Sequence, residues 1–109
     1  MTDKKLLQGN LDLILLSILE QGEMYGLEIT KEVQAQSNDY FKFSLGSLYP
    51  ALHRLEQAGQ ISGEFRTPQR GGSPVKYYQL TEHGKTALAA KRQEFEQFSA
   101  AIRNLWNAN

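Results

Sequence analysis

Arginine, lysine, histidine and tyrosine, whose side chains bind phosphates and the edges of bases, gather between residues 44 and 76 of this chain. Tyr49, His53 and Arg54 fall within one amphipathic stretch, and Arg70 and Lys76 follow it. Arginine and lysine pair with phosphate oxygens, and arginine also reads guanine in the major groove. The chemistry that these residues favour is noncovalent recognition of a nucleic acid.

Catalysis has no comparable set of residues. The two histidines, His53 and His83, stand far apart, and the sequence has no cysteine, which excludes thiolate nucleophiles, thiolate metal sites and disulfides. The sequence also lacks an H-x-x-x-H pair, a glycine-rich phosphate loop and a nucleophile elbow. We therefore expect no enzyme, no metal and no cofactor.

The polar residues belong to a helix predicted to end at Gln57. Leucines at three- and four-residue spacing form its inner face: Leu45, Leu48, Leu52 and Leu55. The residues predicted to face outward are small, polar or basic: Gly46, Ser47, Pro50, His53, Arg54 and Gln57.

Two residues are candidate caps for the start of this helix. If Ser44 is the cap, Pro50 lies beyond the first turn and removes one hydrogen bond. If Ser47 is the cap, Pro50 sits in the first turn without that loss. The sequence leaves both starts open.

A hairpin is predicted after the helix. Residues 61–66 and 75–80 are short runs of β-branched and aromatic residues, and Gly and Pro are frequent in the loop 67–74 between them. The loop tip carries Arg70, Gly71 and Gly72. The tandem tyrosines Tyr77 and Tyr78 are interpreted as strand packing rather than as platforms for bases.

Two further helices are predicted, one from Leu11 with Asn10 as its cap and one from Tyr25 or Gly26 to residue 36. The alternation of residues 41–43 predicts a short strand. The order helix, helix, strand, helix, strand, strand is typical of a winged helix-turn-helix. The fold class is therefore α+β and mainly helical.

Thr81 is predicted to cap a last helix of about 25 residues; at ~1.5 Å per residue this helix is longer than a small core can cover. Apolar side chains recur along it at alternating three- and four-residue spacing: Leu88, Phe95, Phe98, Ile102 and Leu105. Such a narrow stripe is typical of helix association, and Leu7 is a further candidate contact. We expect a homodimer, with residues 1–80 as the DNA-binding segment and residues 81–109 as the dimerisation helix of one continuous unit.

The net charge of zero conceals an uneven distribution. Residues 10–40 carry one base and six acids, whereas residues 41–80 carry five bases and two acids, a local charge of +3. Binding to a DNA backbone needs a basic face, not a basic protein. No window of 18 apolar residues exists, so no membrane span is expected. We expect a cytoplasmic location.

Three blocks of this sequence closely resemble the PadR family of bacterial transcriptional regulators: MYGLEI at 24–29, GSLYPALHRLEQAGQI at 46–61 and KYYQLTEHG at 76–84. The resemblance covers nearly the whole chain, and the short C-terminal region is similar to that of small members that dimerise through one C-terminal helix. It implies a homodimer that binds a pseudo-palindromic site in double-stranded DNA, usually as a repressor that a small molecule releases.

The resemblance also implies which residues meet DNA. The third helix would read the groove, the start of the second would meet a phosphate, and the hairpin would supply the wing. The predicted DNA-binding residues are Tyr25, Ser44, Gly46, Ser47, Tyr49, Pro50, His53, Arg54, Arg70, Gly71, Gly72 and Lys76. Three have a second interpretation: Tyr49 as a core residue, His53 as a solvated surface residue and Arg70 as an exposed turn residue.

Some small PadR-like proteins bind flat apolar molecules between the two C-terminal helices, against an aromatic side chain. Phe98 falls where the resemblance places that side chain, although members noted for this binding carry tryptophan there. The only tryptophan of this chain, Trp106, lies about two turns later. The hypothetical effector site consists of Phe95, Phe98 and Ile102.

The rival interpretation is a winged helix that binds another protein and has no DNA target. The basic segment 41–80 argues against it, and the zero net charge argues for it.

Overall fold

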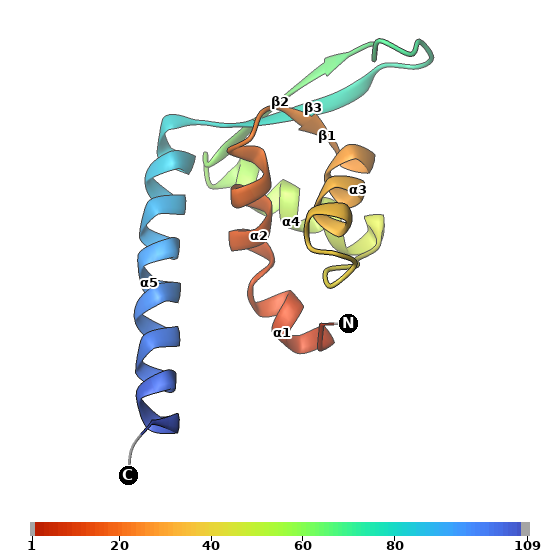
Figure 1. Ribbon diagram of the computed structural model, residues 1–109. Coiled ribbons are helices and arrows are strands. Elements are labelled where there is room, and N and C mark those ends of the chain that lie inside the picture. The colour runs from red at the N-terminus through yellow and green to blue at the C-terminus, as the bar shows by residue number, and fades with distance from the viewer. Residues whose placement is uncertain (1, 108–109) are drawn as a thin grey trace.

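The computed structural model describes residues 2–107, so residue 1 and residues 108–109 of the two predicted segments lie outside it (Figure 1). The elements, in chain order, are α1 (Lys4–Gly9), α2 (Leu11–Leu19), β1 (Met24–Tyr25), α3 (Gly26–Gln36), α4 (Leu45–Gln57), β2 (Ile61–Arg66), β3 (Val75–Leu80) and α5 (Glu82–Trp106). The predicted fold class, a mainly helical winged helix-turn-helix with a long C-terminal helix, is confirmed.

A three-stranded antiparallel sheet joins the wing to the helices. Its strand order is β1-β3-β2, and Ile61 pairs with Leu80 at the base of the β2–β3 hairpin. On the other edge of β3, Tyr25 pairs with Tyr77. The hairpin projects from the helical body, and β1 leads directly into α3 (Figure 1). The sheet therefore connects the start of α3 to the wing.

The short strand predicted around Phe41 and Phe43 is wrong. Residues 40–44 are irregular, and both phenylalanines lie half-buried against the core. Two side chains that pack on a core from an irregular segment produce the same alternation as a strand. The third strand instead consists of Met24 and Tyr25, which are too few to give a periodic signal.

The core forms around α2, which is apolar on nearly all sides. Leu15 and Leu16 are completely buried there, and α3, α4 and the first turns of α5 pack around them. The buried cluster consists of Leu11, Leu15, Leu16, Ile18, Leu19, Ile29, Val33, Leu48, Ala51, Leu52, Leu55, Ile61, Tyr78 and Leu88. Asn10 precedes α2 as predicted but does not cap it, because its side-chain amide donates to the carbonyl of Leu6 at 2.9 Å.

Ser44, and not Ser47, caps α4. The backbone N–H of Ser47 donates to Ser44 Oγ at 3.2 Å, so Pro50 lies inside the helix. Pro50 removes the donor for the carbonyl of Gly46, but both residues are exposed, so water can replace the missing bond. Leu45, predicted as buried, is exposed because it lies at the first helical position, on the flank of the buried stripe.

The start of α5 is fixed tightly to the rest of the fold. Thr81 caps it as predicted, since its Oγ1 accepts from the N–H of Gly84 at 3.0 Å. The same hydroxyl donates to the carbonyl of Gly59 at 2.6 Å. Further along α5, where it packs on α2, Arg92 donates two hydrogen bonds to Glu20 at the end of α2. These hydrogen bonds lower the pKa of the Glu20 carboxyl.

Beyond these turns the side chains of α5 are largely exposed. Of the predicted dimer stripe, Phe98 and Leu105 are 65% and 75% exposed, whereas Leu88 is buried in the core of its own protomer. Leu7 is also buried within the protomer, and its neighbour Leu6 is the exposed one. The C-terminal half of α5 therefore carries a row of apolar side chains that are not covered within the described protomer.

Gly84 gives the first testable prediction. A Cβ at this position would lie 1.9 Å from the carbonyl oxygen of Gln60, which is backbone and has little freedom to move. We expect Gly84→Ala to lower the free energy of unfolding by about 1–3 kcal/mol, as overpacking does. Thermal and urea unfolding measure this. The matched control is Gly9→Ala, where a Cβ meets nothing within 4 Å; equal effects of the two variants would contradict the prediction.

Candidate nucleic-acid interface

The outer face of α4 is exposed and polar. Gly46, Pro50, His53 and Gln57 follow one another along it, and all four are exposed. None of them is acidic, and the buried leucines lie on the opposite side of the helix. His53 is thus a surface residue, with Gln57 Nε2 3.5 Å from its Nε2. This face has the size, polarity and lack of negative charge that a helix in a DNA groove requires.

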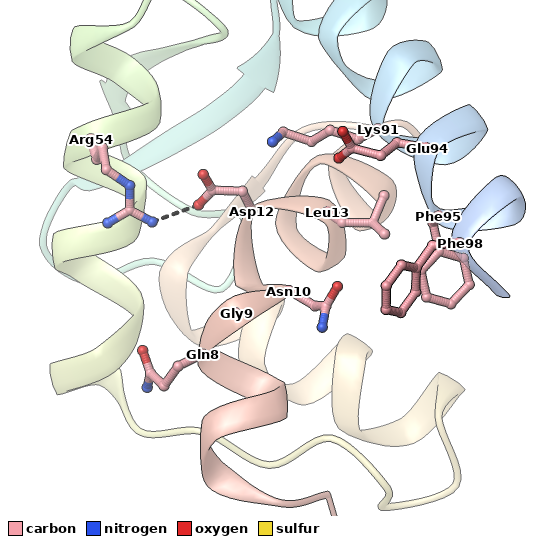
Figure 2. Close-up of a pocket in the computed structure, with 10 residues that line it drawn as sticks. All are labelled: Gln8, Gly9, Asn10, Asp12, Leu13, Arg54, Lys91, Glu94, Phe95 and Phe98. Carbon is pink, nitrogen blue, oxygen red and sulfur yellow. Dashed lines mark hydrogen bonds and ion pairs between the residues drawn. The ribbon is translucent and has the colours of Figure 1, made fainter. Parts of the chain in front are cut away.

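Arg54 lies on one flank of that face rather than at its centre. Its Nη2 donates to Asp12 Oδ1 of α2 at 2.6 Å (Figure 2). The side chain is still mostly exposed, and the partner carboxylate is further from solvent. In the free protein the guanidinium is therefore held toward α2, so contact with a base or phosphate requires it to leave Asp12.

Tyr49 lies on the opposite flank of α4 and is 47% exposed, so the core interpretation of this residue is wrong. Its ring leans on Gly26, where a Cβ would lie 2.5 Å from the Tyr49 hydroxyl. Gly26 is the first residue of α3, and any larger residue there would displace the ring. Tyr49 therefore bridges the exposed face of α4 and the start of α3.

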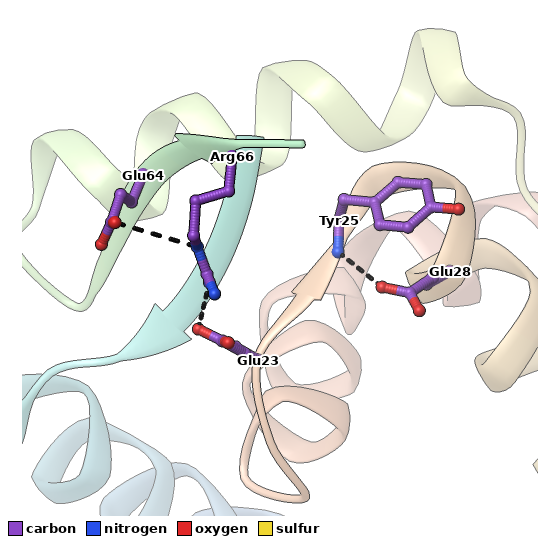
Figure 3. Close-up of polar contacts among 5 residues, drawn as sticks. All are labelled: Glu23, Tyr25, Glu28, Glu64 and Arg66. Carbon is purple, nitrogen blue, oxygen red and sulfur yellow. Dashed lines mark hydrogen bonds and ion pairs between the residues drawn. The ribbon is translucent and has the colours of Figure 1, made fainter. Parts of the chain in front are cut away.

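The start of α3 carries a carboxylate where a phosphate was predicted. The N–H of Tyr25 donates to Glu28 Oε1 at 3.1 Å (Figure 3). An acid in the first turn stabilises this end of the helix but also repels a phosphate. The Tyr25 ring itself is half-buried beside Tyr77 of β3.

The wing loop 67–74 is exposed except for Pro68, which is buried, and the loop turns through two glycines. Gly71 and Gly72 have φ angles of 86° and 96°, and the N–H of Gly71 donates to the carbonyl of Pro68 at 2.9 Å. These left-handed conformations favour glycine. Arg70 leans back so that its guanidinium carbon lies 5.5 Å from the centre of the Tyr25 ring. Arg70 is thus both an exposed turn residue and a cation presented beside the start of α3.

Lys76 is held at the root of the wing and does not extend from it. Its Nζ donates to Glu56 Oε1 of α4 at 2.9 Å, which raises the pKa of the ammonium group. The stem crosses Gly63, where a Cβ would lie 2.3 Å from Lys76 Cε. The buried ring of Tyr78 lies beneath the ammonium at 5.6 Å, and burial raises the pKa of that phenol. Lys76 thus fixes the hairpin to α4.

Sequence reasoning missed one cation of this region, Arg66 at the end of β2. Its Nη2 pairs with Glu23 at 2.5 Å, its Nε lies 3.8 Å from Glu64 Oε1, and the hydrogen bond to Glu23 raises its pKa (Figure 3). Its guanidinium stacks over the ring of Tyr77 at 4.4 Å. The one available signal was the position of Arg66 at the end of a predicted strand, beside the wing loop.

Two hollows flank the residues predicted to bind an effector. Phe95 and Phe98 line a polar hollow of about 290 Å³ together with Asp12, Arg54 and Lys91 (Figure 2). Phe95 also borders an apolar hollow of about 580 Å³, which α2, the N-terminal segment, the end of α3 and the residues after α3 line on the other sides. Ile102 is half-buried and lines neither hollow.

Within residues 2–107 no group of three or more His, Asp or Glu side chains is arranged to hold a metal ion. Over the same described part of the chain, no helix combines the length and the apolar character needed to cross a membrane.

The fold and this surface define a winged helix with an exposed helix face beside a basic hairpin. Comparison with known proteins identifies the family, because the profile of the "Transcriptional regulator PadR-like family" matches residues 15–90. A transcriptional regulator of Mycobacterium tuberculosis is 32% identical over 80 residues, which span 73% of this chain and 70% of that protein.

Solved structures agree with this match. A transcriptional regulator from Clostridium thermocellum is similar with a TM-score of 0.85 and 27% identity, covering 95% of this chain and 97% of that one. A PadR-like transcriptional regulator from Bacillus cereus has a TM-score of 0.83 and 28% identity, covering 97% of this chain and 100% of that one. The chain belongs to the PadR-like family of transcriptional regulators, which confirms the resemblance seen in the sequence.

Proposed function

We propose that this regulator is a homodimeric, sequence-specific DNA-binding protein that represses transcription until a small apolar or aromatic molecule releases it. The outer face of α4 carries the proposal, since it is exposed, free of acidic side chains and adjacent to the wing. The face offers few groups that reach base edges, chiefly His53 and Gln57, with Arg54 on the flank. One copy would therefore read little sequence, and two copies would enter major grooves about 34–36 Å apart.

The repressor assignment and the release by an effector rest on the family. Repression needs only a bound dimer that occupies DNA. A protein partner in place of DNA remains the competing function, and the first experiment separates the two.

In vitro selection from random duplexes tests DNA reading directly. We expect the recovered duplexes to share a pseudo-palindromic sequence, because a two-fold symmetric dimer presents the same face twice. The recovered duplex then serves as the probe for the variants below. A folded protein that enriches no common sequence would contradict the proposal and favour the protein-interaction module.

The wing makes a second prediction, measured by fluorescence anisotropy over a series of salt concentrations. Arg70 has no carboxylate partner among the described residues, so Arg70→Ala should weaken binding to every duplex. The slope of log K against log salt should fall by about 0.9 for each lost phosphate contact. Lys76→Ala also removes one positive charge, but that charge is already paired with Glu56. The salt slope should therefore change less for Lys76→Ala than for Arg70→Ala. Equal slopes for wild type and Arg70→Ala would show that the wing does not touch DNA.

The dimer makes a third prediction. Phe98 and Ile102 lie on the predicted stripe of α5, so Phe98→Asp with Ile102→Asp should bury two charges in the seam and separate the protomers. Sedimentation equilibrium measures the mass. Gln97→Asp places one charge about 100° around the helix from Phe98, outside the predicted stripe, and should leave the dimer intact. A double variant that still sediments as a dimer would place the interface elsewhere.

The effector makes a fourth prediction, with planar aromatic dyes as the probe. Binding beside Phe98 would bring a dye near Trp106, the only tryptophan, and should change its fluorescence. Phe98→Ala should weaken the effect, because stacking on an aromatic ring contributes to binding flat ligands. Unchanged fluorescence together with no heat of binding by calorimetry would contradict this site.

A further inference from the structure

Four side chains pack in a row at the root of the wing, and we name them the wing-root cluster: Arg66, Tyr77, Tyr25 and Arg70. The guanidinium carbon of Arg66 lies 4.4 Å from the centre of the Tyr77 ring. The Tyr77 and Tyr25 rings meet edge to face at 5.4 Å, and Arg70 covers the Tyr25 ring at 5.5 Å. Two arginines thus lie on the outer sides of two packed tyrosines, and cation–π contacts hold both guanidinium groups in place.

The cluster borders a hollow of about 430 Å³ between the wing loop and the start of α3. Both guanidinium groups reach this hollow, and a planar guanidinium binds a phosphate through two parallel hydrogen bonds. Tyr49 of α4 packs on Gly26, which stands in the sequence between two residues that line the hollow, Tyr25 and Glu28. A backbone phosphate flanking a groove occupied by α4 would fall on this side of the helix.

The guanidinium group of Arg66 already has a carboxylate partner in the free protein. Glu23, in the turn before β1, takes its Nη2, and both side chains are about two-fifths exposed (Figure 3). Ion pairs as exposed as this one are weak, so a phosphate with the same bidentate chemistry can displace the carboxylate. Arg66 would keep its stack on Tyr77 during the exchange, while Glu23 turns into solvent.

The local charge shows what this pairing does. Among the charged side chains that line the hollow, Glu23 and Glu28 balance Arg66 and Arg70, so the hollow has no net positive charge before DNA arrives. We propose that the wing-root cluster is a binding site for one DNA backbone phosphate, and that Glu23 closes it in the free protein by occupying Arg66. The inference rests on the DNA-binding function proposed above and adds a sequence-independent brake on it.

Glu23→Gln tests the brake. The probes are the duplex recovered by selection and an unrelated duplex of equal length, measured by anisotropy at several salt concentrations. We expect Glu23→Gln to bind both duplexes about two- to fivefold more tightly, with their affinity ratio unchanged, because a phosphate contact carries no sequence information. Arg66→Ala should weaken both and lower the salt slope by about 0.9.

Two comparisons separate this site from a general charge effect. Glu20→Gln removes the same charge from another arginine pair, Glu20–Arg92 between α2 and α5, and should give a smaller gain. The gain from Glu23→Gln should also vanish when Arg66→Ala is already present. Glu23→Gln and Glu20→Gln carry the test even where Arg66→Ala fails to fold.

The outcomes distinguish the two proposals. The site is overturned, with DNA binding intact, when wild type binds the selected duplex but Glu23→Gln binds it no more tightly than Glu20→Gln does. It is likewise overturned when the gain persists in the Arg66→Ala background. A wild-type protein that binds neither duplex overturns DNA binding itself and this inference with it.

Discussion

The relative positions of α4, the hairpin and α5 depend on one set of backbone contacts, where the residues after the end of α4 meet the residues at the start of α5. Gly59 turns the chain out of α4 at a φ of 75°, and the carbonyl of Gln60 then accepts from the N–H of Thr81 at 3.1 Å. The Thr81 hydroxyl holds the carbonyl of Gly59, and Gly84 packs directly on Gln60. Backbone atoms make nearly all of these contacts, so they leave little freedom between α4, the hairpin and α5. The direction of α5 is thereby fixed relative to α4, and a dimer formed through α5 would set the spacing of two α4 helices.

The cations near the exposed face of α4 are neutralised within the molecule. Arg54, Arg66 and Lys76 each hold a carboxylate from another element. Pairs this exposed contribute little to stability, but they orient long side chains that otherwise sample many rotamers. This arrangement reconciles a net charge of zero with the DNA-binding function proposed above. Contact with a phosphate would then exchange one anion for another, and the affinity for DNA would depend on the carboxylates as much as on the arginines.

Local signals in the sequence were enough for the fold but not for the site. Leucine spacing located α4, yet Ser44 and Ser47 were indistinguishable as caps because both offer the same hydroxyl at a suitable distance from Pro50. Leu45 was misplaced because the first residue of a helix need not reach the core. The ion pairs had no local signal at all, since 42 residues separate Asp12 from Arg54 and 43 separate Glu23 from Arg66. Contacts at such separation arise from the sheet and the helix packing, and periodicity does not encode them.

The exposed half of α5 lies close to residues that contact α4, so dimer association through α5 and the outer face of α4 are connected through few side chains. Phe98, Leu105 and Trp106 are each at least 65% exposed, and burying apolar area of this kind contributes about 25 cal/mol per Å², which favours a partner. Phe95 borders both hollows beside α5, and Asp12 in the polar hollow holds Arg54 of α4. A molecule that entered the polar hollow would therefore meet Phe95 on one side and the Asp12–Arg54 pair on the other. The Asp12–Arg54 ion pair thus links a molecule bound in the polar hollow beside α5 to the position of the Arg54 guanidinium on α4.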